Sequence, residues 1–131
     1  MGGEMRKLMV VEDSAAMRSL IASVLGELED VEIVEVSSGF DALKQLARES
    51  IALLILDINM PGINGLELLS FVRKNPAYAR TRVLIVTTEA GDEDRRRAMA
   101  LGADDYVTKP FEPQALVAAV RRLLSAGGER W

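Results

Sequence analysis

The feature that most constrains the fold is a regular alternation between short apolar runs and segments whose apolar residues follow helical spacing. Apolar runs typical of buried β-strands occur at residues 8–11, 31–36, 51–56, 83–86 and 105–107, the last of them short and mixed. Each run is followed by a segment in which apolar residues recur every three or four positions, as one face of an amphipathic helix requires. The chain therefore alternates strand and helix five times.

The first helical segment carries the clearest apolar face and the fourth carries the weakest. The fourth, expected around residues 90–100, has Met99 as its one large apolar residue and the triplet Arg95, Arg96 and Arg97 at its centre. The positions that define the other four faces are Met17, Leu20, Ile21, Val24, Leu25 and Leu28 in the first helix, Phe40, Leu43, Leu46 and Ala47 in the second, Leu66, Leu69 and Val72 in the third, and Leu116, Ala119, Val120, Leu123 and Leu124 in the fifth.

This alternation predicts an α/β fold in which helices cover both faces of one parallel sheet. The third strand is a continuous apolar run, which is typical of a strand buried on both faces. Right-handed crossovers favour a doubly wound (βα)5 three-layer sandwich, for which the strand order 2-1-3-4-5 is common. The length of 131 residues suits one domain, and we expect a single domain over 1–131, with a core from about residue 6 to 124 and a short tail at 125–131.

Residues that the chain lacks exclude several classes of site. The sequence has no cysteine and no histidine, which excludes disulfides, thiolate metal sites and catalytic triads that use histidine. Any metal ion should therefore be hard and bound through oxygen, as Mg²⁺ is. A net charge of -4 argues against a nucleic-acid partner, and the longest apolar run, residues 51–56, is too short to cross a bilayer. We expect a cytoplasmic protein with no membrane partner.

Polar residues follow four of the predicted strands. Glu12 and Asp13 come after the first, Asp57 after the third, Thr87 and Thr88 after the fourth and Lys109 after the fifth. Because the carboxyl ends of parallel strands meet at one edge of a sheet, we expect these side chains to lie together. Three crowded carboxylates repel one another unless one of them takes a proton or a cation neutralises them, and without histidine or cysteine that cation is best explained as Mg²⁺.

This cluster suits the chemistry of an aspartyl phosphate. The formal charges of three acids, one divalent cation and Lys109 sum to about zero. A phosphoryl group would add negative charge and change this balance. A carboxylate can act as the nucleophile, while the cation and the lysine stabilise charge on the transferring oxygens. The Thr87 hydroxyl could donate to one of those oxygens, so that phosphorylation would pull the loops that carry Thr87 and Lys109.

Each of these residues also has a simpler explanation when it is taken alone. Asp13 or Ser14 could cap the first helix, and Ser14 can still do so if Asp13 binds a metal ion. Asp57 could be a turn residue, Thr87 a strand former and Lys109 a solvated surface charge. Their joint placement after four different strands is what favours a phosphoacceptor site.

The residues around this cluster resemble the response-regulator receiver family, and within it the stand-alone chemotaxis proteins of the CheY-like type. The resemblance extends from about residue 6 to 124 and rests on the acidic pair Glu12-Asp13, on Leu-Asp-Ile-Asn-Met-Pro-Gly around Asp57, on Thr87, and on Lys-Pro-Phe from Lys109. It implies a flavodoxin-like fold in two-component signalling. It also implies phosphorylation of Asp57 by a histidine kinase or a small phosphodonor, with Thr87 and Lys109 assisting.

The resemblance further implies a ligand set and a peptide geometry. Mg²⁺ would be held by Asp13, Asp57 and the backbone carbonyl of Asn59, with Glu12 acting through bound water. The Lys109-Pro110 peptide bond would be cis.

It also implies a switch and a means of resetting it. Tyr106 would turn inward when Thr87 moves, while Asn59 and Glu89 would tune dephosphorylation and give a short-lived phosphoryl state. The domain would hydrolyse only its own aspartyl phosphate and would not turn over other substrates as an enzyme does.

The expected output is a binding event. Because the sequence ends after the fifth helix, we expect no attached effector, and the signal should leave through the fourth helix, fifth strand and fifth helix to a protein target. Arg95, Tyr106, Val107 and Arg121 are candidate contacts. The arginine triplet itself is more simply a solvated helix face, although it could dock an acidic partner.

Three other functions compete with this interpretation. A phosphatase of the haloacid-dehalogenase type also uses a nucleophilic aspartate, but it needs a second acid where this chain has Asn59. A flavodoxin-like cofactor binder would need a phosphate-cradling loop after the first strand, and here Glu12 and Asp13 would repel phosphate. A receiver that docks without phosphorylation would leave the acidic, hydroxyl and lysine set unexplained.

Overall fold

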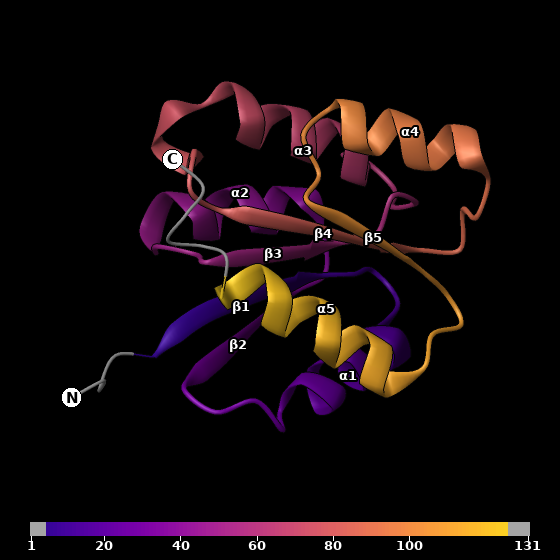
Figure 1. The fold of residues 1–131 in the computed structure, drawn as a ribbon. Coiled ribbons are helices and arrows are strands. Elements are labelled where there is room, and N and C mark those ends of the chain that lie inside the picture. Colours follow the sequence, from indigo (N-terminus) through magenta and orange to yellow (C-terminus); the bar gives the residue numbers. More distant parts are fainter. Residues whose placement is uncertain (1–4, 126–131) are drawn as a thin grey trace.

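The computed structural model describes residues 5–125, which form a five-stranded parallel sheet between two layers of helices (Figure 1). The strand order is β2-β1-β3-β4-β5, as predicted. The elements in chain order are β1 (Arg6–Val11), α1 (Ala15–Leu25), β2 (Val31–Val36), α2 (Gly39–Arg48), β3 (Leu53–Leu56), α3 (Gly65–Lys74), the short 3-10 helix η1 (Pro76–Tyr78), β4 (Arg82–Thr87), α4 (Asp92–Ala100), β5 (Asp105–Thr108) and α5 (Pro113–Ser125).

The sheet separates two hydrophobic cores. Helices α1 and α5 cover one face, and α2, α3 and α4 cover the other (Figure 1). Successive side chains of a strand point to opposite faces, so Leu8 and Val10 of β1 enter the core under α1 and α5, while Met9 and Val11 enter the other. All residues of β3 and β4 are buried, which accounts for the apolar runs Leu53–Leu56 and Val83–Val86.

Some apolar positions that were expected to be buried are exposed. Leu20 of α1 is 47% exposed and Phe40 of α2 is 65% exposed, because the contact of each helix with the sheet is narrower than the apolar stripe in its sequence. Leu28 lies beyond the end of α1, where Gly26 caps the helix. In α4 the residue buried against the sheet is Ala98, while Met99 is 38% exposed.

The remaining differences are at element ends. Helix α5 continues through Ser125, which the sequence had assigned to the tail, and residues 126–131 of the predicted tail lie outside the described part of the chain. The sequence did not predict η1. Between residues 5 and 125 no helix combines the length and the apolar character that a membrane span needs.

A buried ionic network fixes the edge of the sheet where the strands begin. The Asp104 carboxylate, just before β5, accepts hydrogen bonds from Arg73 of α3 at 2.9 Å and from the Val83 backbone N–H at 2.8 Å. Arg82 donates to the other oxygen at 3.4 Å. The three charged side chains are at most 14% exposed. Asp104 therefore joins α3, β4 and the start of β5.

We expect Asp104→Ala to lower the free energy of unfolding by about 3–5 kcal/mol, because it leaves two buried guanidinium groups without their shared carboxylate. Urea denaturation followed by circular dichroism measures this loss. Glu27→Ala is the control, since the Glu27–Arg121 pair is 46% and 61% exposed, and it should change stability far less. Equal losses in both variants would contradict a structural role for the network.

Candidate functional site

The structure brings the predicted polar residues to the edge of the sheet where the strands end. Glu12 and Asp13 follow β1, Asp57 follows β3, Thr87 is the last residue of β4 and Lys109 follows β5. The Lys109 backbone N–H donates to the Thr87 carbonyl at 2.7 Å, which ties the end of β5 to the end of β4. Parallel pairing of β1, β3, β4 and β5 is therefore what assembles the cluster.

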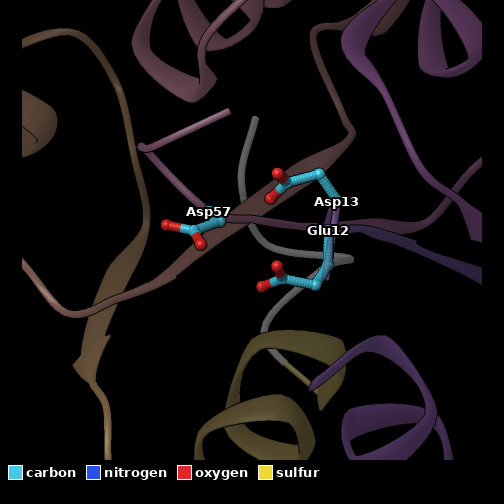
Figure 2. Close-up of side chains that lie close together, drawn as sticks. All are labelled: Glu12, Asp13 and Asp57. Carbon is cyan, nitrogen blue, oxygen red and sulfur yellow. The ribbon is translucent and has the colours of Figure 1, made fainter. Parts of the chain in front are cut away.

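Three carboxylates lie side by side at this edge (Figure 2). Glu12, Asp13 and Asp57 each offer an oxygen, and these oxygens all lie within 4.8 Å of one another. Glu12 and Asp57 are buried, at 2% and 7% exposure, while Asp13 faces solvent. Such a concentration of negative charge is stable only with cationic partners.

Lys109 supplies one positive charge inside the cluster. Its Nζ donates to Glu12 Oε1 and to Asp57 Oδ2, both at 2.8 Å. Burial lowers the pKa of Lys109, but hydrogen bonds to Asp57 and Glu12 raise it more, so that it lies above the usual value. Because the folded-state pKa is raised, stabilisation by this ammonium group is fully present at neutral pH and is lost only at strongly alkaline pH.

The charge that remains fits a divalent cation. Three carboxylates and one ammonium group leave about two negative charges beside solvent, and oxygen donors are those that Mg²⁺ prefers. Glu12 and Asp57 both use their two oxygens, because Glu12 Oε2 accepts from the Ser14 N–H at 2.9 Å and Asp57 Oδ1 accepts from the Asn59 N–H at 3.1 Å, in addition to the bonds from Lys109.

The geometry of α1 shows whether Asp13 or Ser14 caps this helix. Ser14 is the N-cap residue, and its Oγ accepts a hydrogen bond from the Met17 backbone N–H at 3.3 Å. Ser14 thus satisfies the helix end, and the Asp13 carboxylate lies with Glu12 and Asp57.

Glu89, in the loop after β4, joins the site to the predicted switch residues. Its backbone N–H donates to Thr87 Oγ1 at 3.3 Å, and its carbonyl accepts from the Tyr106 hydroxyl at 2.6 Å. Its carboxylate accepts from the Asn59 side-chain amide at 2.7 Å. The sequence singled out all four residues, but it gave no sign that they meet at Glu89.

Tyr106 is already turned inward in this structure. It is 5% exposed, and the Arg95 guanidinium lies 5.6 Å from the centre of its ring. Arg95 also donates to the Tyr106 carbonyl at 3.3 Å. Burial raises the pKa of the Tyr106 phenol, and the negative charges of Asp94 and Glu89 raise it further. The phenol therefore stays protonated as a donor to Glu89.

The sequence profile of the response regulator receiver domain matches residues 8–121. The chain belongs to this family. The chemotaxis protein CheY homolog of Campylobacter jejuni is 38% identical over 122 residues, which cover 92% of this chain and 94% of that protein. Chemotaxis protein CheY1 of Helicobacter pylori is 37% identical over 111 residues, which cover 84% and 90%. The structure of Vibrio cholerae chemotaxis protein CheY4 matches with a TM-score of 0.84 at 31% identity, covering 92% of this chain and 99% of that chain.

The chain is thus a CheY-like receiver domain, a signalling domain consistent with two-component systems. Receiver domains bind Mg²⁺ at an acidic cluster, and this receiver has such a cluster in Glu12, Asp13 and Asp57. The Lys109-Pro110 peptide bond is cis, as the resemblance implied.

Gly65 is a site residue whose role the sequence did not reveal. It is the first residue of α3, and a Cβ atom there would lie 2.1 Å from the Asp57 backbone carbonyl oxygen. Its N–H donates to the Ile58 carbonyl at 3.0 Å. The absence of a side chain lets α3 begin directly against the backbone of Asp57.

We expect Gly65→Ala to destabilise the receiver by about 1–3 kcal/mol, because the new methyl group forces the backbone of Asp57 aside. Urea denaturation measures the loss of stability. The matched control is Gly91→Ala, where the nearest atom to the new Cβ is the end of the flexible Asp94 side chain at 3.2 Å. If both variants lost the same stability, the close approach at Gly65 would not be the cause.

The raised pKa of Tyr106 gives a second prediction. In Tyr78→Phe, Tyr106 is the sole tyrosine of the chain. We expect its tyrosinate absorbance to appear at higher pH in the folded receiver than in the same variant unfolded in urea, because the folded state retains the proton. Stability from this group should correspondingly fall as pH rises above the unfolded-state pKa. Coincident titrations of folded and unfolded protein would show that the phenol is not held in a buried environment.

Proposed function

We propose that Asp57 accepts a phosphoryl group from a phosphohistidine of a histidine kinase, or from a small phosphodonor, in a Mg²⁺-dependent reaction. The observation that carries this proposal is the pair of hydrogen bonds that Lys109 makes to Asp57 and Glu12 inside a cluster of three carboxylates. The arrangement offers a buried nucleophile with one fixed positive charge beside it. The family to which the chain belongs supports the same chemistry.

In the proposed transfer, a carboxylate oxygen of Asp57 attacks phosphorus and forms a P–O bond. The bond from phosphorus to the donor breaks, and the donor leaves with its electron pair. Lys109, already 2.8 Å from Asp57 Oδ2, would pair with an oxygen of the transferred group. Asp13, Asp57 and the Asn59 backbone carbonyl would hold Mg²⁺, with Glu12 acting through water. That ion would neutralise charge on the phosphoryl oxygens.

The proposed switch begins at Thr87. Its hydroxyl oxygen accepts from the Glu89 N–H, and a phosphoryl group would offer the hydroxyl proton a new acceptor. A shift of Thr87 would move Glu89, whose carbonyl holds the Tyr106 hydroxyl. The rearrangement would thus reach the face formed by α4, β5 and α5, through which we propose that the receiver binds its protein target.

The proposal also covers the loss of the phosphoryl group, the domain organisation of the chain and its location. Water would hydrolyse the aspartyl phosphate within the domain itself, at a rate tuned by Asn59 and Glu89, whose contact at 2.7 Å lies at the site. We propose that residues 1–131 act as one receiver domain in the cytoplasm, where a kinase supplies the phosphoryl group. This role is that of a phosphoacceptor and not of an enzyme with an external substrate.

Intact mass after incubation with acetyl phosphate tests the phosphotransfer. We expect a gain of about 80 Da that requires Mg²⁺, is prevented by EDTA and is labile to base, as an acyl phosphate is. Asp57→Asn should abolish the gain, whereas Asp41→Asn, in the first turn of α2, should retain it. A folded protein that gains no mass, or that gains it equally without Asp57, would contradict the proposal and favour a receiver that docks without phosphorylation.

A further inference from the structure

We propose that Arg18 of α1 is a positioning residue for the Mg²⁺ site, because it fixes the peptide unit that carries Asp13. The Arg18 guanidinium donates a hydrogen bond from Nη1 to the Glu12 backbone carbonyl at 2.8 Å. This inference rests on the proposed function for the use of Asp13 as a ligand of Mg²⁺. It adds a residue that lies outside the polar groups at the ends of the strands.

Helix geometry explains why an arginine at this position reaches the end of β1. Side chains of an α-helix tilt toward its N-terminus, so a long side chain in the first turn extends back over the residues before the helix. Ser14 is the N-cap of α1, and its carbonyl accepts the Arg18 N–H at 2.9 Å. Arg18 is thus one turn inside the helix, and its guanidinium reaches the carbonyl of Glu12, two residues before the N-cap.

The bond from Arg18 to Glu12 bears directly on Asp13. The Glu12 carbonyl and the Asp13 N–H belong to one planar peptide unit, which ends at the Asp13 Cα. Glu12 is also held through its own N–H, which donates to the Val36 carbonyl of β2 at 3.2 Å. Together the two bonds fix the orientation of the peptide from which the Asp13 side chain leaves.

The Asp13 carboxylate depends on this backbone for its orientation. Glu12 and Asp57 each receive hydrogen bonds on both carboxylate oxygens, but no donor within residues 5–125 bonds the Asp13 carboxylate. Asp13 is exposed, and its carboxylate lies beside those of Glu12 and Asp57 (Figure 2). Of the three carboxylates, that of Asp13 is therefore the most sensitive to the bond from Arg18.

Glu35 of β2 orients the Arg18 guanidinium and offsets its charge. Arg18 Nε lies 3.6 Å from Glu35 Oε1, and the arginine side chain is 20% exposed. The two charges are opposite and adjacent, so the pair adds little net charge beside the acidic cluster. We therefore expect Arg18 to act on Mg²⁺ binding through the geometry of the Asp13 peptide and not through its charge.

The direction of the change in Mg²⁺ affinity separates geometry from charge. If Arg18 only opposed Mg²⁺ as a nearby positive charge, Arg18→Gln would tighten Mg²⁺ binding and Glu35→Gln would weaken it. If Arg18 positions Asp13, Arg18→Gln weakens Mg²⁺ binding. Glu35→Gln then has a small effect, because the hydrogen bond from Arg18 to the Glu12 carbonyl remains.

Arg6 provides a matched control for the loss of a structural bond. Its guanidinium also donates to a backbone carbonyl of another element, that of Leu124 in α5 at 3.0 Å. Arg6 is the first residue of β1, at the edge of the sheet opposite to the acidic cluster. Arg6→Gln therefore removes a comparable bond between an arginine and a carbonyl without approaching the Mg²⁺ site.

The test is isothermal titration calorimetry of MgCl₂ into the unphosphorylated protein at constant ionic strength, with urea denaturation of each variant. We expect Arg18→Gln to weaken Mg²⁺ binding about tenfold, as the loss of a residue that orients a metal ligand does. Arg18→Lys keeps the charge but lacks the planar fork, and should weaken binding about threefold. Arg6→Gln and Glu35→Gln should change it by less than about twofold.

Phosphorylation of Asp57 gives a second readout that separates positioning from general damage. The rate of mass gain from acetyl phosphate is measured as Mg²⁺ is increased. In Arg18→Gln, the Mg²⁺ concentration at half-maximal rate should rise about tenfold, because the ion binds more weakly. The rate at saturating Mg²⁺ should stay within about twofold of wild type, because the nucleophile and Lys109 are unchanged.

Unchanged or tighter Mg²⁺ binding in Arg18→Gln would overturn the inference. Equal weakening in Arg18→Gln and Arg6→Gln would also overturn it, because loss of stability alone would then explain both. If Arg18→Gln does not fold, the same comparison is made between Arg18→Lys and Arg6→Lys, and equal affinities in these two variants would overturn it as well.

The inference and the proposed function fail in different ways. If wild type gains no phosphoryl mass at any Mg²⁺ concentration, the proposed phosphotransfer is wrong, while calorimetry still decides the role of Arg18. If wild type is phosphorylated but Arg18→Gln binds Mg²⁺ as wild type does, the inference about Arg18 alone is wrong. If wild type binds no Mg²⁺, both are wrong.

Discussion

The site depends on one buried ammonium group shared by two carboxylates. Lys109 comes from the end of the edge strand β5, yet its Nζ bonds Glu12 after β1 and Asp57 after β3, which are nearer the centre of the sheet. Without this charge, two buried carboxylates would face each other with no counter-ion, which is a costly arrangement in a protein interior. The same ammonium group therefore stabilises the acidic edge and holds the last β–α loop beside Asp57.

The two ends of the sheet are stabilised differently. Where the strands begin, Asp104 is held by Arg73, Arg82 and a backbone N–H, so α3, β4 and the start of β5 form a rigid corner. Where they end, the loop after β4 is held to its surroundings by single hydrogen bonds at Glu89. The loop beside the acidic cluster is therefore held less firmly than the corner around Asp104 at the opposite end of the sheet.

Most of the fold and the membership of the site could be predicted from sequence, because both depend on local patterns. Continuous apolar runs such as residues 51–56 identify buried parallel strands, and parallel strands end at one edge, so Glu12, Asp57 and Lys109 had to meet. What could not be predicted depends on distances between elements. The backbone approach at Gly65 and the meeting of Asn59 with Tyr106 through Glu89 leave no pattern along the chain. The exposure of Phe40 likewise depends on how widely α2 contacts the sheet.

The surroundings of Tyr106 also limit the backbone hydrogen bonds that the edge strand β5 can offer to another molecule. An edge strand offers backbone N–H and carbonyl groups to which a strand from another molecule can pair, with the risk of aggregation. At Tyr106 the N–H is bonded by the Asp105 side chain and the carbonyl by Arg95. The middle of β5 is thus protected against strand addition by its own neighbours. A molecule that approaches β5 at Tyr106 therefore meets the side chains of Asp105 and Arg95 in place of free backbone groups.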